Sequence, residues 1–392
     1  MPRVHRMPSP ALTIVVAAVL GCGEDATSPT SLEPASEVAG AQALNFQLIS
    51  AGGFHSCGLT LQGRAYCWGY NLLGQLGDGT VTHRSSPVPV AKGLTFRQVS
   101  AGTHHSCGVT TGDQLYCWGD NQHGEVGDGT TAKKRRVPVL VAGGRRYRNV
   151  RAGYQVTCAV TTADLPFCWG ANSVGQLGDG TTTPRLTPKR VAGGLLFRAI
   201  FPGTEHTCGM TTGDKVYCWG DNGFGELGDG TNERRLKPVA VVGNVAFRQV
   251  SAGNGHNCGM DSHNLAYCWG RNIHGQLGDG TRINRSSPTP VASGPLDGVA
   301  PGGEHTCAIS TEGRLLCWGW NFWGQLGDGT TTERVLPVPV SGNLRVTTMN
   351  AGGGHNCAVT LNGRGFCWGS GGLGELGNGG TGNSAIPVPV AD

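Results

Sequence analysis

A pair of cysteines ten positions apart recurs seven times in this chain, at intervals of 49 to 51 residues. The first copy lies in HSCGLTLQGRAYCWG, residues 55–69, where a His precedes the first Cys by two positions and a Trp follows the second. Self-similarity at a period of about 50 residues is typical of propellers and solenoids. Each copy is therefore one structural unit, and the repeat has to be interpreted before any single site.

Within one unit, short apolar runs alternate with Gly and Pro breaks, which predicts four strands. In the first unit these are residues 46–50, 55–60, 64–69 and 87–90. The prolines of PVPV (87–90) suit an edge strand, because such a strand need not donate every ladder bond. Four short strands with one wet edge cannot bury both faces alone, whereas seven radially packed copies can.

The central hairpin of each unit can be checked by its turn. If Cys57 faces Cys67 across the ladder, the loop is residues 61–63, and its third position favours a left-handed residue. That position holds Gly63, Asp113, Asp164, Asp214, Asn264, Gly313 and Gly363. All are residue types that tolerate positive φ. The register is self-consistent, and it places the two cysteines of each unit directly opposite each other.

The Trp after the second Cys recurs in every unit, which favours a packing role between blades over a ligand role. These residues are Trp68, Trp118, Trp169, Trp219, Trp269, Trp318 and Trp368. We therefore predict an all-β fold, a seven-bladed β-propeller of four-stranded antiparallel blades over residues 44–392.

Residues 101–130, AGTHHSCGVTTGDQLYCWGDNQHGEVGDGT, carry the repeat almost whole. This pattern, with the following P-V-P-V, resembles the repeat of the regulator of chromosome condensation family. The resemblance covers about residues 44–392 and implies a seven-bladed β-propeller. The last unit departs from the pattern, because Gly371 replaces the usual Asn and Asn378 the usual Asp.

The cysteine pairs could be disulfides, metal ligands or redox centres. Zinc sites usually bring cysteines together at spacings of two to four residues, and Val156 replaces the nearby His in the third unit while both cysteines remain. Seven equivalent copies also argue against a reactive thiol in one special environment. We expect one cross-strand disulfide per blade, joining Cys57 to Cys67, Cys107 to Cys117, Cys158 to Cys168, Cys208 to Cys218, Cys258 to Cys268, Cys307 to Cys317 and Cys357 to Cys367.

The first 22 residues predict an export signal. A basic start is followed by an apolar run at 11–20, which is too short to span a bilayer but suits a signal peptide. Residues 19–22, VLGC, resemble the lipobox of bacterial lipoproteins, although Leu20 departs from the residue usual there. An ordinary signal peptide is the alternative. Cys22, the cysteine left without a partner, would be the lipidated mature N-terminus.

Residues 23–43 are rich in Ser, Pro and Glu and predict a flexible linker between the anchor and the propeller. We therefore expect a lipid-anchored protein of the bacterial cell envelope or the extracellular space. The membrane would be reached through the lipid alone.

In such a blade the connections between strands one and two and between strands three and four lie on the same face. They also vary most between units, so we expect this face to bind a partner. The candidate residues are Phe54, Tyr70, His123, Tyr154, Phe224, Arg271, Trp320, Phe322 and Trp323. Exposed aromatic residues of this kind are typical of binding hot spots. Alternatively, Trp320 and Trp323 fill the sixth long loop locally.

A basic cluster is the other irregularity: Lys133, Lys134, Arg135 and Arg136, followed by Arg145, Arg146, Arg148 and Arg151. It is interpreted either as a solvated loop or as a surface for anionic lipid or polysaccharide. The net charge of +4 does not by itself imply nucleic acid.

We find no catalytic motif and expect no catalytic residue, metal or cofactor. The predicted function is a monomeric, exported, non-catalytic scaffold that binds a protein or a glycan, for which secreted relatives that inhibit β-lactamase are a precedent. The resemblance also implies a second hypothesis, guanine nucleotide exchange on a small GTPase, although the repeat spacing leaves no room for that family member's inserted wedge. A polysaccharide-acting enzyme is the third.

Overall fold

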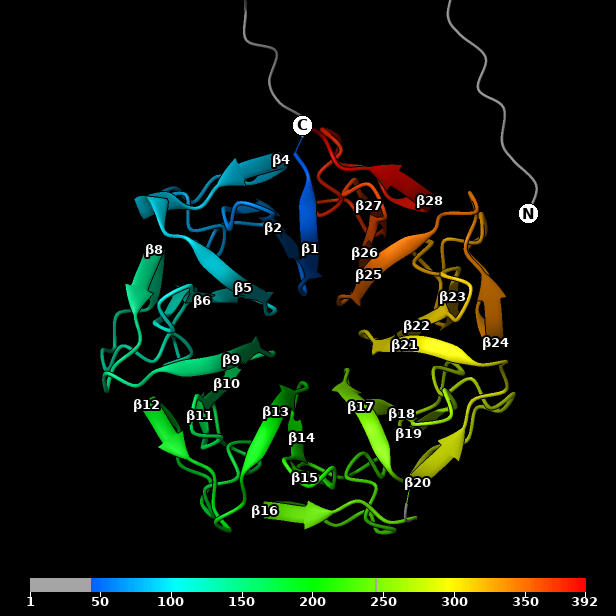
Figure 1. The fold of residues 1–392 in the computed structure, drawn as a ribbon, viewed down its shortest axis with the longest axis horizontal. Helices are drawn as coiled ribbons and strands as arrows, with labels where there is room; N and C mark the ends of the chain where they lie inside the picture. The colour runs from blue at the N-terminus through cyan, green and yellow to red at the C-terminus, as the bar shows by residue number, and fades with distance from the viewer. Residues whose placement is uncertain (1–43, 244) are drawn as a thin grey trace, which may run out of the picture. The chain divides into compact units, whose positions relative to one another are not determined.

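The computed structural model describes residues 44–243 and 245–392, and the signal, Cys22 and linker predicted for residues 1–43 lie outside this part. Seven four-stranded antiparallel sheets form a ring around a central channel (Figure 1). Each sheet contains the four strands of one sequence repeat, in chain order from the channel to the rim. The predicted fold class, including one disulfide per blade, is confirmed.

The strands that line the channel are β1 (Phe46–Ala51), β5 (Phe96–Ala101), β9 (Tyr147–Ala152), β13 (Phe197–Pro202), β17 (Phe247–Ala252), β21 (Leu296–Pro301) and β25 (Val346–Ala351). The second strands are β2 (His55–Thr60), β6 (His105–Thr110), β10 (Val156–Thr161), β14 (His206–Thr211), β18 (His256–Asp261), β22 (His305–Ser310) and β26 (His355–Thr360).

The third strands are β3 (Ala65–Gly69), β7 (Leu115–Asp120), β11 (Pro166–Gly170), β15 (Val216–Gly220), β19 (Ala266–Gly270), β23 (Leu315–Gly319) and β27 (Gly365–Gly369). The rim strands are β4 (Arg84–Pro89), β8 (Lys134–Leu140), β12 (Arg185–Arg190), β16 (Arg235–Ala240), β20 (Arg285–Pro290), β24 (Arg334–Pro339) and β28 (Ser384–Pro389). No helix in the described part of the chain is long and apolar enough to cross a membrane.

The rim strand begins three residues earlier than the 87–90 predicted for the first blade. Arg84 pairs with Gly69 across an irregularity in the ladder, and its guanidinium contacts the Asp78 carboxylate. This side-chain contact draws the end of the long loop onto the sheet. The PVPV motif is therefore the end of the rim strand and not its whole length.

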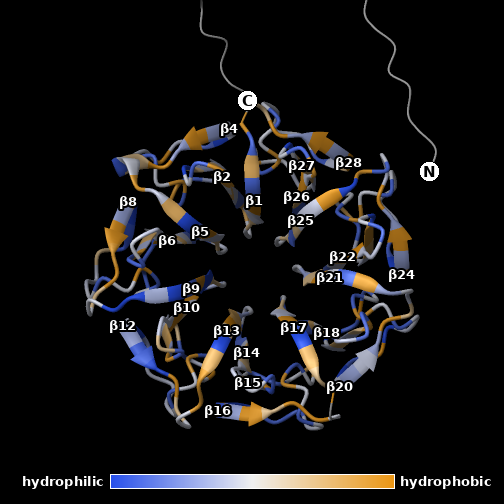
Figure 2. Cartoon of the chain, in the orientation of Figure 1, coloured by the Kyte–Doolittle hydropathy of each residue, from blue (hydrophilic) through white to orange (hydrophobic). Residues whose placement is uncertain are grey.

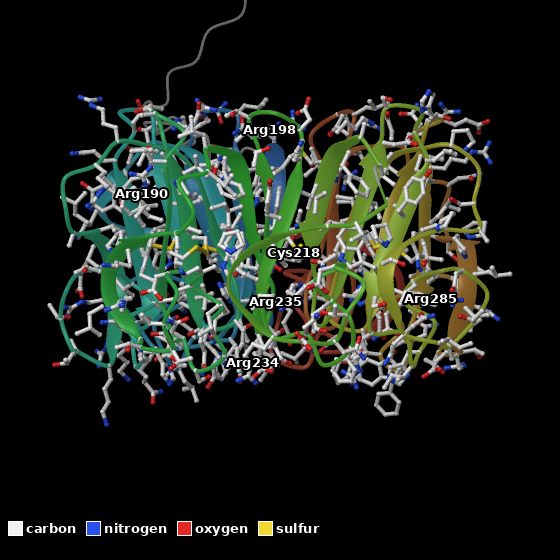
Figure 3. The ribbon with its side chains drawn as sticks, turned by 90° about the horizontal axis from the view of Figure 1, so that it is seen from below. Arg190, Arg198, Cys218, Arg234, Arg235 and Arg285 are labelled. Carbon is white, nitrogen blue, oxygen red and sulfur yellow. A yellow bond between two sulfur atoms is a disulfide. The ribbon has the colours of Figure 1, made fainter. Side chains whose placement is uncertain are left out.

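The predicted hairpin register is correct. Cys57 lies opposite Cys67, with Cα atoms 4.1 Å apart and a disulfide between them, the short spacing of a non-hydrogen-bonded antiparallel pair. All seven residues at the third loop position have positive φ, from 61° at Asp164 to 81° at Gly363. In the side view of Figure 3 the disulfide sulfurs lie midway between the two faces, and the fourteen cysteines of the seven bridges are fully buried.

Each repeated Trp packs against the preceding blade. Trp118 of blade two is fully buried in a cluster with Leu76 of blade one and with Phe96 and Val99. Its indole Nε1 donates to the backbone carbonyl of Gln75 at 2.9 Å. The same bond recurs at every blade junction. The interpretation of the Trp as a packing residue is therefore correct.

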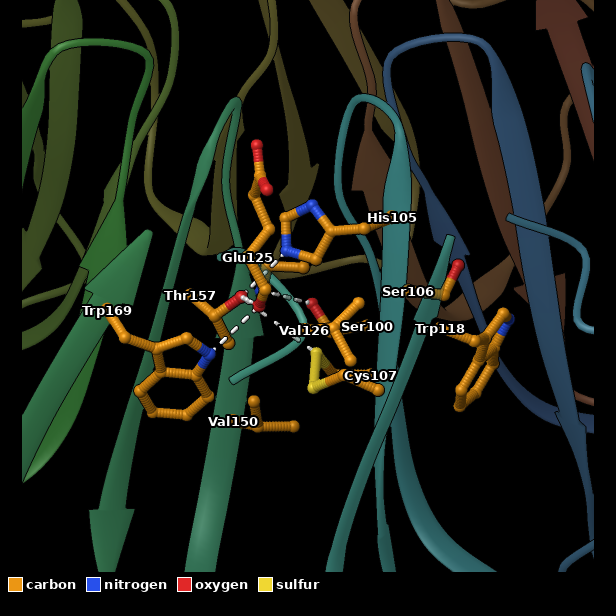
Figure 4. The surroundings of a disulfide bond; sticks show 12 residues. Ser100, His105, Ser106, Cys107, Trp118, Glu125, Val126, Val150, Thr157 and Trp169 are labelled. Carbon is orange, nitrogen blue, oxygen red and sulfur yellow. Dashed lines mark hydrogen bonds between the residues drawn. A yellow bond between two sulfur atoms is a disulfide. The ribbon is translucent and has the colours of Figure 1, made fainter. Parts of the chain in front are cut away.

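The repeated His also joins neighbouring blades. His105 Nε2 lies 2.7 Å from Thr157 Oγ1 of the next blade, and that hydroxyl donates to the carbonyl of Glu125, which also accepts from Trp169 (Figure 4). Since Thr157 donates its hydrogen to the carbonyl, it accepts from the His. Burial lowers the pKa of His105 to about 3, so the imidazole is neutral. The His two positions before the first Cys of the repeat therefore connects one blade to the next.

The ring closes by packing, because every blade already has its own four strands. Blade seven contacts blade one through the junction used elsewhere: His355 Nε2 lies 2.7 Å from Ser56 Oγ. The backbone N–H of Phe46 donates to the carbonyl of Gly363 at 2.8 Å. The two ends of the described chain therefore meet without exchanging a strand.

Candidate binding face

In each blade a hydrogen bond joins the short loop between strands one and two to the long loop between strands three and four, at one face of the propeller. The backbone N–H of Tyr70, at the start of the long loop, donates to the carbonyl of Phe54 in the short loop at 2.9 Å. The same bond occurs in all seven blades, between Phe54 and Tyr70, His104 and Asp120, Gln155 and Ala171, Glu205 and Asp221, Gly255 and Arg271, Glu304 and Trp320, and Gly354 and Ser370. Residue pairs that vary between repeats are thus held at equivalent places around the ring.

Buried polar side chains hold the long loop from beneath. Asn71 is buried, accepts the N–H of Leu76 through Oδ1 and donates through Nδ2 to the carbonyl of Thr82. Gln75 is also buried, and its Oε1 accepts the N–H of Leu73 at 3.1 Å. These bonds satisfy backbone groups that a buried loop would otherwise leave unpaired. The exposed loop residues therefore stand on a fixed frame.

The Asp of GDGT is part of this frame. Asp78 accepts from the N–H and hydroxyl of Thr80 and pairs with Arg84. Burial raises the pKa of Asp78, but the hydrogen bonds from Thr80, Asn71 and Arg84 outweigh it and hold that pKa below its usual value. Asp78 therefore caps the turn, and in the last blade Asn378 caps Gly380 in the same way.

Blades one to three place one aromatic group on this face, which we call the first aromatic group: Phe54, Tyr70, His83, His104 and Tyr154. Phe54 stacks on His104 with ring centroids 5.3 Å apart, and Tyr70 stacks on His83 at 4.9 Å. His104 lies 6.4 Å from Tyr154. Phe54 and Tyr154 remain 41% and 39% exposed, so the group is accessible from solvent.

Blades five and six place a second aromatic group on the face: His274, Trp320, Phe322 and Trp323. The Trp320 ring lies 4.7 Å from Trp323 and stacks on Phe322 at 6.1 Å. Phe322 is 67% exposed, although its neighbours are half-buried. The two tryptophans therefore pack on each other, as the local-packing alternative expects, and still present an exposed edge through Phe322.

A charged bridge extends the second group toward blade four. The guanidinium of Arg271 lies over the Phe224 ring, 5.2 Å from its centroid, and pairs with the Glu304 carboxylate. Gln276 Nε2 donates to the same carboxylate at 2.8 Å. Burial raises the pKa of Glu304, while Arg271, His274 and Gln276 act in the opposite direction.

The candidate residues do not form one patch. Phe54, Tyr70 and Tyr154 gather in the first group, while Trp320, Phe322, Trp323, Arg271 and Phe224 belong to the second. His123 instead contacts Glu125, with Nδ1 3.0 Å from Oε1. His83 was missed, although it is another variable position of the long loop. Glu304 lies at a variable position of the short loop, which the sequence places on this face, but only the structure shows that it pairs with Arg271.

Blade seven separates the two groups with small residues. Its short loop carries Gly353 and Gly354, and its long loop begins Ser370, Gly371 and Gly372. The Trp323 ring lies against Gly354, where an added Cβ would come within 2.6 Å of ring atoms. The face therefore has aromatic side chains on both sides of a stretch from which few side chains protrude.

The basic residues do not form a single surface. Lys134, Arg135 and Arg136 belong to strand β8 rather than to the loop, and Arg135 pairs with Asp128 at 2.6 Å as part of the repeated frame. Arg146 lies at the other end of the blade, where it donates to the carbonyl of Gly112. The two runs are close in sequence, but strand β8 separates them in space.

The comparisons with known proteins agree with this architecture. A family model described as the RCC1-like domain matches residues 17–355. Human WBSCR16 superposes with a TM-score of 0.77 at 19% identity, over 84% of this chain and 95% of that one. Prp20p of Saccharomyces cerevisiae gives 0.75 at 20% identity, over 85% and 87%. The ectodomain of the Arabidopsis thaliana receptor kinase ACR4 gives 0.55 at 20% identity, over 88% and 98%.

Proposed function

This chain belongs to the RCC1-like domain family, and we propose that it is a non-catalytic propeller that binds a partner protein through the face described above. The single observation that carries the proposal is the contrast on that face. The loop backbone is bonded in the same way in all seven blades, whereas the side chains mounted on it differ and include two exposed aromatic groups. A rigid frame that presents aromatic anchors is the usual composition of a protein-binding hot spot.

Protein binding also agrees with what is described for a relative of the same fold. Prp20p of yeast is described with binding to Gsp1p and histones. At 20% identity the comparison shows a shared fold alone, so our proposal about the partner rests on the chemistry of this chain's own loops. In our proposal the partner presents apolar or aromatic side chains to the two groups, and a glycan is the alternative that the experiment distinguishes.

We further propose that the chain is exported and anchored through a lipid on Cys22. Seven disulfides support export, because such bonds form and persist in oxidising compartments. The apolar run at 11–20 and the VLGC sequence at 19–22 support the anchor. Expression in a bacterial host, with fractionation and a globomycin-type block of lipoprotein processing, tests this. A cytosolic, unprocessed chain would contradict it.

Partner binding is tested by crosslinking capture with the full chain and quantitative mass spectrometry. The wild type is compared with a Trp320→Ala/Trp323→Ala variant and a Phe54→Ala/Tyr70→Ala variant. We expect at least one protein to be captured by the wild type and to be reduced at least tenfold in one double variant. Leu61→Ala/Leu361→Ala, at exposed positions of the hairpin loops at the opposite end of the blades, is the matched control and should leave capture unchanged.

Two outcomes would contradict the proposal. Equal capture by all four proteins would remove this face from the interaction. Binding to a glycan array that both double variants abolish would assign the face to glycans instead. Calorimetry with the purified partner should then measure its affinity for the wild type and for each double variant. These affinities tell whether the partner contacts one aromatic group or both.

A further inference from the structure

The central channel has an asymmetry that the seven-fold repeat does not explain. It has a volume of about 420 Å³ and is lined by the seven inner strands. Arg151, one position before the end of β9, is the one charged residue in its lining within the described chain. The equivalent positions of the other blades hold Ser50, Ser100, Phe201, Ser251, Ala300 and Asn350.

In the described part of the chain Arg151 has no carboxylate partner, whereas two other arginines on inner strands are paired. Arg97 pairs with Asp113 at 2.8 Å and Arg148 pairs with Asp164 at 2.6 Å, but no residue in 44–243 or 245–392 forms an ion pair with Arg151. Its guanidinium lies 5.7 Å from the centre of the Phe201 ring. Arg151 is exposed, so a ligand that enters the channel can reach its guanidinium.

Other polar groups of the channel lining also favour an anion. Ser100 Oγ accepts the N–H of Ala152 at 3.1 Å, and Ser50 Oγ accepts the N–H of Ala101 at 3.0 Å. These bonds occupy acceptor sites of the hydroxyls, and they leave the hydroxyl hydrogens free to donate. The lining that the structure describes includes neither Asp nor Glu.

Asn350 completes the donor set in the same way. Its Oδ1 accepts the N–H of Ala51 at 2.8 Å, so its Nδ2 group remains as a donor. Apolar side chains in the same lining, Leu48, Phe201 and Met349, would contact a hydrocarbon portion. In Figure 2 both hydrophilic and hydrophobic residues occur along the inner strands.

We propose that the channel binds a small organic carboxylate, with Arg151 as the residue that contacts its charged end. A guanidinium matches a carboxylate in a two-pronged hydrogen bond, and the channel volume falls within the range of small-ligand sites, about 300–1,000 Å³. The Phe201 ring faces the same space and supports the apolar part. This site is independent of the loop face, because its residues lie on the inner strands.

The test uses benzoate as the probe, with the purified full chain and saturation-transfer NMR followed by calorimetry. We expect one benzoate per propeller and at least a tenfold weaker affinity in Arg151→Gln. The affinity of Arg151→Lys should lie between those of the wild type and Arg151→Gln, because Lys keeps the positive charge but cannot make the two-pronged hydrogen bond of the guanidinium. Arg190→Gln, at an exposed position of the rim strand β12, is the matched control and should bind like the wild type.

The variant is expected to fold, since Ser, Phe, Ala and Asn already occupy the equivalent positions of other blades, and an unchanged melting temperature would verify it. Absence of benzoate binding to the wild type would overturn the proposal, as would equal binding to Arg151→Gln. Binding of inorganic phosphate in place of benzoate would overturn the assigned ligand class. None of these outcomes depends on the partner of the loop face.

Discussion

The indole Nε1 of Trp68 donates a hydrogen bond to the backbone carbonyl of Glu375, 307 residues later in the chain, at 2.8 Å. This contact joins the first blade to the last. The same bond joins Trp219 to Gln176 within the ring, at 3.0 Å. Closure therefore uses the ordinary blade junction, and no strand is shared between the ends.

We predict that Trp68→Phe and Trp219→Phe lower the free energy of unfolding by similar amounts, about 1–3 kcal/mol, because each leaves part of a buried carbonyl unsatisfied. Urea unfolding with the disulfides intact measures both. If Trp68→Phe were neutral while Trp219→Phe destabilised the protein, blades one and seven would be opening before the rest of the ring.

The seven disulfides should resist reduction until the protein unfolds, because every cysteine of these pairs is fully buried. After treatment with dithiothreitol under native conditions, mass spectrometry should show no gain in mass from reduced cysteines. In guanidinium, the gain should be about 14 hydrogens, two for each of the seven bridges. A smaller gain would contradict the full set of pairs.

Removing one disulfide should lower the free energy of unfolding by a modest amount, because each bridge closes a short loop. Cys57→Ala/Cys67→Ala should lower the free energy of unfolding by about 2–3 kcal/mol, since the bridge closes a loop of separation 10. Chemical unfolding measures this. The same change in blade five, Cys258→Ala/Cys268→Ala, serves as the comparison, and a large difference between them would show that the blades are not equivalent.

Glu226 should make the protein less stable as the pH rises. Burial raises the pKa of this carboxyl from 4.5 to about 7, opposed by hydrogen bonds from backbone N–H groups. The folded state then binds more protons than the unfolded state, so stability falls between about pH 4.5 and pH 7. In blade five the equivalent position holds Gln276, whose neutral amide Oε1 accepts the backbone N–H of His274.

We predict that Glu226→Gln raises the free energy of unfolding above pH 7, by up to about 3 kcal/mol, and has little effect at pH 4. Denaturant unfolding across this range measures the difference. Glu233→Gln, a carboxylate of the same blade whose side chain is 75% exposed, is the control. A stabilisation independent of pH would show that the carboxyl charge is not its cause.

The buried histidines should have the opposite pH dependence. Burial lowers the pKa of His105 to about 3, so the folded state binds fewer protons than the unfolded state and stability falls as pH drops from about 6.5 toward 3. His105→Val, which copies the natural Val156 of blade three, should remove about one proton from the slope of stability against pH. His263→Val, with an 82% exposed side chain, should leave the slope unchanged.

The fold was predictable because each blade is specified locally and the specification is repeated. The cysteines ten apart and a turn residue such as Gly63 or Asp113 define one hairpin register, and a period of about 50 residues defines the number of blades. The start of the rim strand was not predictable, since it depends on the side-chain contact of Arg84 with Asp78.

The binding face was predictable as a set of positions but not as an arrangement. Chain order places the variable residues in the connections at one end of the blades, because alternate connections of an antiparallel sheet share an end. Which of them meet depends on neighbouring blades: Phe54 stacks on His104 of blade two, and Arg271 pairs with Glu304 of blade six. The repeat pattern contains no information about such contacts between blades.

The sequence by itself determined the blade, its register, its disulfides and the face that varies, because these depend on residues within about 50 positions of each other. Tertiary structure alone decided how the ring closes between Trp68 and Glu375, and that the run from Arg145 to Arg151 is divided between an outer end of the blade and the channel. The physical reason is the circular packing of the blades. It brings residues from distant repeats into contact and turns one position of each inner strand toward a shared axis.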